Sequence, residues 1–479
     1  MKNELISTRD PRRKKITLKG AILKSQPLDK GLYVFTKFPK INLSKLYTLN
    51  YQEHAEAILS NFDFKITSQT LQQIIYDSYG KQWNDTEITP ITKFEKNKYL
   101  LELYHGPTQA FKDLALQFLP RILSAYKKPK EILRALGASS GDTISAAHFG
   151  VGNIKGLQSY FLLPKKGPSK IQLLQATSHG FKNAATILIA GDFDAGQKVI
   201  KKILTSSEYS DFKKRNNFIT FNSINILRIL VQTIYYFYSY STLVKRKEIR
   251  IGDLVNFSVP SGNFGDALAG VYAQKMGLPI SKINIATNAN DVLHKFLQTG
   301  KYIPRKKIIH TLAPSQDITI ASNFERMLFE VVKNPRRVSK LMINLKVKGF
   351  FEVNYEELTK FRKVLTSSST TDIQITRTMK NLYSTGNILI DPHTATGVHG
   401  GTEVFGINPK IPTIFLATAE AVKFPQPPGV PQNKQQYTSI VKNLERNPKT
   451  FFCSTANEKD IVRTLKKAIN SANKNLTAK

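Results

Sequence analysis

The stretch His105-Gly106-Pro107-Thr108-Gln109-Ala110-Phe111-Lys112-Asp113 is the most informative part of this 479-residue chain. It brings one lysine out of a Gly-Pro turn and onto the first turn of an apolar helix. Lys112 is poorly solvated there, which favours the neutral amine that condenses with an aldehyde as a Schiff base. The position alone is more typical of a surface lysine, since buried lysines are rare. The residues that flank Lys112 reverse that preference.

Outward from this stretch, short apolar runs alternate with helical patterns. The alternation predicts an α/β fold, with parallel sheets covered by helices on both faces. We expect a mostly helical N-terminal part (residues 1–95) and two α/β parts (96–250 and 251–479) that can interleave. The predicted strands are 99–104, 132–136, 255–259, 283–286 and 414–417; the predicted helices include 111–122, which Pro120 should kink or interrupt, 142–148 and 266–276.

Four chemically suggestive elements directly follow predicted strands: Lys112, the loop 139–143, the loop 262–265 and Thr418. Ligands of parallel sheets bind at the carboxyl ends of the strands. We therefore expect these four elements to share one rim.

The loop Gly262-Asn263-Phe264-Gly265 opens a predicted helix. Glycines let the backbone approach a ligand closely, and the helix start offers unpaired N–H donors, so the loop can cradle a phosphate. An ordinary strand-to-helix turn has the same appearance. A Walker-type lysine and hydroxyl are missing after Gly265, and no G-x-G-x-x-G follows a strand, which argues against ATP and nicotinamide cofactors.

Three further sites have two interpretations each. The Ser139–Thr143 loop could hold a carboxylate or only cap a helix. Arg228 lies in an apolar helix and needs an anionic partner, which is either a substrate phosphate or, more commonly, a structural carboxylate. His393, in a turn that begins at Asp391, could carry protons or only hold the turn. No histidine pair has metal-ligand spacing, and no G-x-S-x-G nucleophile motif occurs, so we expect no metal.

The net charge of +35 is the one abnormal bulk property. Basic runs are short and scattered, which indicates a solvated surface rather than a nucleic-acid site. The single cysteine, Cys453, excludes a disulfide framework and fits a reducing cytoplasmic compartment. Residues 1–15 lack the apolar core of a secretory signal. The segment 224–244 contains Asn225, Arg228 and Gln232, so we interpret it as a buried helix rather than a membrane span.

Several ordered motifs together resemble the long-form threonine synthases, enzymes of the tryptophan-synthase-like fold that depend on pyridoxal 5'-phosphate (PLP). The similarity runs nearly end to end. It rests on these segments: Ile6–Arg9, Gly31–Val34, His105–Asp113, Ser140–Thr143, Asn222–Asn225 with Arg228, Gln232, Tyr235 and Tyr236, Pro260–Asp266, Ser322–Arg326 and Asp391–Thr394. The resemblance implies two parallel-sheet α/β domains with PLP in the cleft between them.

The resemblance also implies a reaction, in which O-phospho-L-homoserine and water give L-threonine and phosphate. Lys112 would form the Schiff base and then move protons. Gly262, Asn263, Phe264 and Gly265 would bind the cofactor phosphate, and Thr418 would hydrogen-bond the pyridine nitrogen. Ser140, Asp142 and Thr143 would surround the substrate carboxylate, with Asn225 and Arg228 as further substrate contacts. The expected protein is a cytoplasmic monomer or homodimer without nucleic-acid or membrane partners.

The sequence departs from the family pattern at several positions. Ile144 replaces a usual glycine and crowds the loop that precedes it. Glu420 replaces a histidine and puts an acid near the expected pyridine partner, where an ionised carboxylate would favour a protonated ring. Ile226 and Asp10 replace a tryptophan and a glycine. The alternatives are another PLP enzyme of this fold, such as a serine or threonine dehydratase, a basic nucleic-acid-binding protein, or an enzyme that has lost its turnover.

Overall fold

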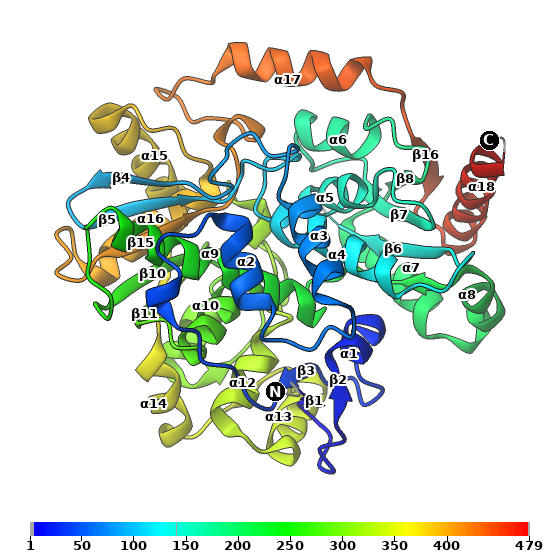
Figure 1. The fold of residues 1–479 in the computed structure, drawn as a ribbon. Coiled ribbons are helices and arrows are strands. Elements are labelled where there is room, and N and C mark those ends of the chain that lie inside the picture. Colours follow the sequence, from blue (N-terminus) through cyan, green and yellow to red (C-terminus); the bar gives the residue numbers. More distant parts are fainter. Residues whose placement is uncertain (1–3, 140, 478–479) are drawn as a thin grey trace.

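Two parallel sheets of different size form the body of the protein (Figure 1). The computed structural model describes residues 4–139 and 141–477. The larger sheet has the order β14 (Leu365–Ser369), β11 (Ile280–Thr287), β10 (Val255–Pro260), β15 (Thr413–Ala417), β5 (Lys98–Glu102) and β4 (Ile91–Glu95), and only β4 is antiparallel to its neighbour. The smaller sheet is all parallel, in the order β16 (Phe451–Thr455), β8 (Ala184–Ala190), β7 (Leu157–Pro164), β6 (Leu133–Ala138) and β9 (Phe218–Ile219).

The two sheets interleave along the chain. The expected boundary at residue 95 falls inside the β4–β5 hairpin, and β5 pairs with β15, a strand that comes after residue 250. The late strand β16 returns to the smaller sheet and pairs with β8. The sheets therefore interleave, as the sequence allowed for the two α/β parts, and the boundaries of the three parts stay predictions.

The N-terminal part packs against the centre of the molecule. It contains an antiparallel sheet of β1 (Glu4–Ser7), β2 (Ile16–Thr17) and β3 (Tyr33–Phe35), together with helices α1 (Leu18–Lys24), α2 (Tyr51–Leu59) and α3 (Ser68–Ser78). Helix α9 (Ile226–Lys245) packs against α2 of this part, and its residues 226–243 are buried. None of the helices in the described part of the chain combines the length and apolar character needed to cross a bilayer.

Helix α4 (Lys112–Tyr126) runs through Pro120 without interruption; of the two effects predicted for this proline, the interruption does not occur. Proline removes the hydrogen bond to the carbonyl of Leu116, four residues earlier. Gly150, in helix α5 (Asp142–Val151), lies directly against that carbonyl, where a Cβ would come within 1.9 Å of the oxygen. Close packing of two apolar helices at a glycine thus offsets the lost bond and fixes α5 against the helix that begins with Lys112.

Two buried histidines lie under the smaller sheet. Thr186 donates to the carbonyl of Ala176, so its hydroxyl oxygen accepts from His148 Nε2 at 2.9 Å, while Ser159 donates to His148 Nδ1 at 2.7 Å. This arrangement fixes His148 as a neutral ring. The rings of His148 and His179 are 4.8 Å apart. Burial lowers the pKa of His148 well below its usual value and lowers the pKa of His179 to about 4.

We expect this pair to make the fold sensitive to mild acid. Because both pKa values are lower in the folded state, the unfolded chain binds more protons below about pH 6.5, and stability is lost as pH falls from there toward about pH 4. The apparent Tm should drop by several degrees between about pH 7 and pH 5. His179→Gln should flatten this dependence, whereas substitution of the exposed His310 should not; equal slopes would contradict the assignment.

Candidate active site

The Lys112 motif folds into a turn whose residues contact one another. Thr108 donates from its backbone N–H and its hydroxyl to the Asp113 carboxylate, at 2.8 and 2.7 Å. Gly106 is required because a Cβ there would lie 2.6 Å from the Asp113 Cβ. Gln109 adopts a left-handed φ of 57°. These contacts turn the chain from β5 into α4 and set Lys112 at the first residue of the helix.

Lys112 is largely buried, as the sequence predicts. Its Nζ lies 3.3 Å from Asp142 Oδ2, at the start of α5. Burial lowers the pKa of the Lys112 amine, and the nearby Asp142 carboxylate partly opposes that shift. The lysine is therefore easier to deprotonate than one in water, which suits a Schiff-base amine.

A second lysine shares the same carboxylate. Lys423 Nζ lies 2.9 Å from Asp142 Oδ1 and donates to the Thr108 carbonyl, and its side chain is fully buried. Gln172 also donates to Asp142 Oδ1, at 2.8 Å. Burial alone would raise the pKa of Asp142, but the charges of Lys423 and Lys112 hold it far below its ordinary value. Asp142 is thus a permanent anion that contacts both amines.

Thr418 lies beside Lys112 at the carboxyl edge of the larger sheet. The backbone N–H of Phe111 donates to the Thr418 carbonyl at 2.9 Å, and Ala110 forms a bridge with Ala419. Thr418 directly follows β15, which lies between β5 and β10. Its hydroxyl makes no hydrogen bond to another described residue and is free to bind a ligand.

The loop 262–265 follows β10, two strand spacings or about 10 Å from β5. A Cβ on Gly262 would lie 2.9 Å from the Ser315 carbonyl oxygen, so the loop lies directly on the backbone of 314–316. Phe264 has a left-handed φ of 62°, and helix α10 (Gly265–Lys275) begins without a side-chain cap. Within the described part of the chain, the amides of residues 262–265 donate to no other group. The loop has the free donors that a phosphate requires.

Two tyrosines of helix α9 hold the first turn of α10, the helix that follows this loop. Tyr235 and Tyr236 donate from their hydroxyls to Asp266 Oδ1, at 2.6 and 2.9 Å, in the first turn of α10. Burial raises the pKa of Asp266 to about 6, against the effect of the two hydroxyls. The N-terminus of α10 is therefore fixed by buried hydrogen bonds before any ligand arrives.

The remaining predicted substrate residues differ in whether their side chains already have partners within the protein. Arg228 is buried and donates to the Phe221 carbonyl at 2.9 Å, but no described carboxylate forms an ion pair with it, so the more common expectation of a structural carboxylate is wrong. Asn225 is engaged, since it caps α9 and donates to Ile22 and Ser25. Thr143 is partly exposed in the first turn of α5. Ser140 lies outside the described residues.

Glu420 lies in an acidic neighbourhood next to the rim. Its backbone N–H donates to the Gln109 carbonyl at 3.1 Å. Burial raises the pKa of its carboxyl, and the positive charge of His105 partly opposes this. His105 is itself held by Glu102, at 2.8 Å. The acid that replaces the family histidine is therefore more readily neutral than a surface glutamate.

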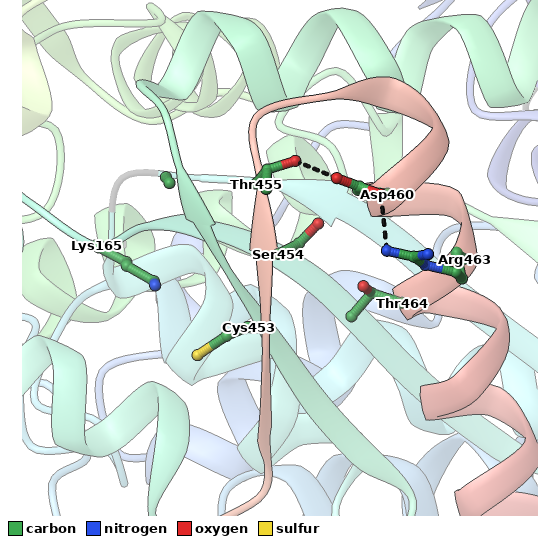
Figure 2. Close-up of a pocket in the computed structure, with 8 residues that line it drawn as sticks. Lys165, Cys453, Ser454, Thr455, Asp460, Arg463 and Thr464 are labelled. Carbon is green, nitrogen blue, oxygen red and sulfur yellow. Dashed lines mark hydrogen bonds and ion pairs between the residues drawn. The ribbon is translucent and has the colours of Figure 1, made fainter.

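The two cavities that stand out on the surface lie away from Lys112. One, of about 320 Å³, is at the carboxyl end of β16 and β8, where Thr455 donates to Asp460 and Asp460 pairs with Arg463 (Figure 2). The other, of about 280 Å³, lies between α2 and α9. No cluster of metal-ligating side chains occurs among the described residues. Neither cavity includes a predicted site residue.

Gly262→Ala should weaken cofactor binding. The new Cβ would press on the Ser315 carbonyl and on Gln316 Cα, at 2.9 and 3.3 Å, and both are backbone atoms that cannot swing away. We expect the Kd for PLP to rise about tenfold or more because the cradle must shift. Absorbance titration of the apoprotein measures this. Gly386→Ala, at an exposed helix end beside a flexible Ile388, is the control and should bind as the wild type does.

A buried amine, a hydroxyl and a loop with free N–H donors along one sheet edge are the groups that a PLP-dependent enzyme of the two-sheet α/β class requires. Residues 4–79 match the family model for the threonine synthase N terminus. The chain is 35% identical over 453 residues to the threonine synthase of Saccharomyces cerevisiae, with 87% of each protein covered. It is 36% identical over 418 residues to that of Pseudomonas aeruginosa, covering 86% of this chain and 87% of the relative.

Solved structures agree with these relatives. The crystal structure of threonine synthase from yeast matches with a TM-score of 0.88 at 32% identity, covering 98% of this chain and 99% of that one. PLP-bound threonine synthase from Brucella melitensis gives the same values. The chain belongs to the threonine synthase family, and its cofactor is PLP.

Proposed function

We propose that the protein converts O-phospho-L-homoserine and water to L-threonine and phosphate at the rim that contains Lys112, Thr418 and the 262–265 loop. One observation carries the proposal: a buried amine with a lowered pKa lies at the end of β5, and an uncapped glycine loop lies two strands away in the same sheet. The family membership supports threonine synthesis over the nucleic-acid alternative.

The residues present fit the cofactor. The amides of residues 262–265 would hold its phosphate, the Thr418 hydroxyl would meet its ring nitrogen, and Lys112 would bond its aldehyde carbon. When bound, PLP supplies an electron sink for carbanions next to the substrate amine. A neutral hydroxyl at the ring nitrogen leaves the ring less protonated than a carboxylate would.

The chain's own groups supply the proton transfers. Lys112 would serve as base and acid toward the substrate carbons when its amine is free, and Asp142 orients its Nζ from 3.3 Å. Asp142 itself binds two lysines, so we assign the direct carboxylate contact to Thr143 and to the backbone N–H groups of residues 142 and 143, which donate to no other described residue. The proposed role of Asp142 is to orient the Lys112 amine.

Arg228 is the proposed ligand of the substrate phosphate. Burial lowers the pKa of its guanidinium to about 10, so it stays charged near neutral pH. A buried charge without an anionic partner is costly, and a bound phosphate would remove that cost. Asn225 would then act by fixing the start of α9, and its direct contact with substrate stays a prediction.

The assay that tests the function compares two reactions on the same purified protein. We expect phosphate release from O-phospho-L-homoserine together with formation of threonine, and little ammonia release from threonine or serine. Ammonia release that exceeds phosphate release would favour a dehydratase instead. Absence of both, with PLP still bound, would indicate an enzyme without turnover, for which Ile144 and Glu420 would be the first positions to revert.

We further propose that the protein works in the cytoplasm as a monomer or homodimer and needs no nucleic acid. The lone free cysteine, exposed on β16, suits a reducing compartment. The scattered lysines support an ordinary charged surface that can draw in a phosphorylated substrate.

A further inference from the structure

Asp391 is a buried carboxylate at the start of helix α16 (Pro392–Phe405), and it accepts more hydrogen bonds than a helix cap requires. Its oxygens accept from the backbone N–H groups of His393 and Thr394, at 2.9 and 3.1 Å. They also accept from the His393 ring at 2.5 Å and from the Thr394 hydroxyl. The two backbone bonds cap the helix, and the two side-chain bonds leave the ring and the hydroxyl each with one free acceptor.

The His393 ring connects Asp391 to the phosphate end of the proposed cofactor site. The backbone N–H of Ser315 donates to His393 Nε2 at 3.0 Å, so Nε2 carries no proton and Nδ1 is the donor to Asp391. Ser315 is the residue whose carbonyl lies under Gly262. The tautomer set by Asp391 therefore holds the backbone on which the 262–265 loop rests. The turn interpretation of His393 is supported, because both of its nitrogens are occupied.

The Thr394 hydroxyl leads to the ring end. It donates to Asp391 and accepts from the backbone N–H of Thr418 at 3.2 Å. Thr418 carries the proposed partner of the pyridine nitrogen, and its carbonyl accepts from Phe111, next to Lys112. Two adjacent residues of one helix turn therefore contact two separate walls of the site.

Close packing makes α16 a rigid base for both contacts. A Cβ on Gly397 would lie 3.0 Å from the Pro260 ring, at the end of β10. A Cβ on Gly401 would lie 2.6 Å from Ser258 and from Phe415, on β10 and β15. Because the helix lies directly on the two strands that lead to Gly262 and Thr418, its first turn cannot shift relative to either strand without steric clash.

We infer that Asp391 is a positioning residue that fixes the cradle at both ends, through His393 and Ser315 at the phosphate end and through Thr394 and Thr418 at the ring end. The inference rests on the proposed placement of PLP between these ends. Asp391 touches neither end itself. Its effect is to set their separation before the cofactor binds.

Two substitutions of His393 test the contact between His393 and Ser315, which we call the phosphate arm. His393→Asn keeps a donor where Nδ1 lies but loses the acceptor for Ser315, and His393→Gln keeps an acceptor where Nε2 lies. We expect the asparagine variant to raise the Kd for PLP about tenfold, and the glutamine variant to stay nearer the wild type. Pyridoxal, which lacks the phosphate, should bind both variants with unchanged affinity. The ³¹P resonance of bound PLP should shift toward its free position only in the asparagine variant.

Thr394→Val tests the contact between the Thr394 hydroxyl and the Thr418 N–H, which we call the ring arm. It removes the acceptor for the Thr418 N–H, so we expect the Kd values for PLP and pyridoxal to rise by the same factor, about tenfold. The ³¹P resonance should stay in place. Thr242→Val is the matched control, since that buried hydroxyl donates only to Tyr238 within its own helix. It should leave both Kd values unchanged.

Several results would overturn the inference. Equal PLP affinity in His393→Asn and the wild type would remove the phosphate arm, and a loss of PLP and pyridoxal binding by the same factor in that variant would show general loosening. An unchanged Thr394→Val would remove the ring arm. Wild-type protein that fails to bind PLP at all would refute the proposed function instead, so the two failures are distinguishable. Melting temperatures of the apoproteins identify any variant that does not fold, in which case Asp391→Asn, which weakens both arms at once, replaces it and should raise the Kd for PLP.

Discussion

Lys112→Ala will abolish covalent attachment of the cofactor and lower turnover by at least about a thousandfold. The amine is the group that must bond the aldehyde carbon and afterwards move the substrate protons, and we expect Lys423, the other lysine on this carboxylate, not to replace it. Lys423 lies on the same carboxylate, but it is fully buried and also bonded to the Thr108 carbonyl. Its Nζ is already engaged by the Asp142 carboxylate and the Thr108 carbonyl.

Borohydride reduction followed by mass spectrometry of the peptides decides between the two lysines. We expect the cofactor mass on the peptide that contains Lys112 in the wild type, and on no peptide in Lys112→Ala. Lys128→Ala, an exposed lysine just after the same helix, is the control and should label and turn over normally. A label on Lys423 would contradict the assignment and move the reactive centre to the 421–423 turn.

Asp142→Asn is expected to be the most destabilising single change among the site residues. It leaves the fully buried Lys423 without a carboxylate, and breaking a buried ion pair costs about 3 kcal/mol or more. Urea unfolding of the apoprotein at neutral pH measures the loss. Glu356→Gln is the control, since that exposed carboxylate pairs only with Lys360 on the surface and should change nothing measurable.

The same variant should shift the pH dependence of activity. The negative charge of Asp142 raises the pKa of Lys112, so its removal lets the pKa fall further below its ordinary value. The neutral amine is then reached at lower pH, and the acid limb of the kcat profile, which reports the complex in which Lys112 is free to act as a base, should move to lower pH. The folded-state pKa of Asp142 is depressed, so its stabilising effect is present above about pH 4 and lost in stronger acid. A limb that moves to higher pH would contradict this assignment.

The sequence predicts most strands of the site because the site lies where local signals are strongest. The predicted strands 99–104, 255–259 and 414–417 correspond to β5, β10 and β15, which are adjacent in the larger sheet. Buried strands are continuous apolar runs, and the loops after them contain glycine and hydroxyl residues. The placement of Lys112, the 262–265 loop and Thr418 on one rim follows from topology alone, whereas the loop 139–143, which was expected on the same rim, follows β6 of the smaller sheet.

Long-range partners were not predictable in the same way. Nothing near Asp142 in the sequence indicates that Lys423 would bind it, and a lone Lys423 is one of many lysines. The missing partner of Arg228 also needed the fold, because a carboxylate on any neighbouring element would have satisfied it. His393 was ambiguous for a similar reason: the donor to its Nε2 is the backbone of Ser315, far away in the chain. The effect of Pro120 was not predictable because Gly150, which packs against the carbonyl left without a hydrogen bond, lies in another helix.

Strand β16, one of the last elements in the sequence, forms the outer strand of the smaller sheet. It pairs with β8 over five residues, and helix α18 (Glu458–Thr477) packs on both strands. During synthesis, residues 133–190 leave the ribosome long before these pieces exist, so the edge of β8 stays open until the last tenth of the polypeptide has been translated. The unpaired edge is a template for aggregation in that interval. Truncated messages or stalled ribosomes should therefore yield insoluble rather than half-folded chains, and chaperone demand during expression should fall on this edge.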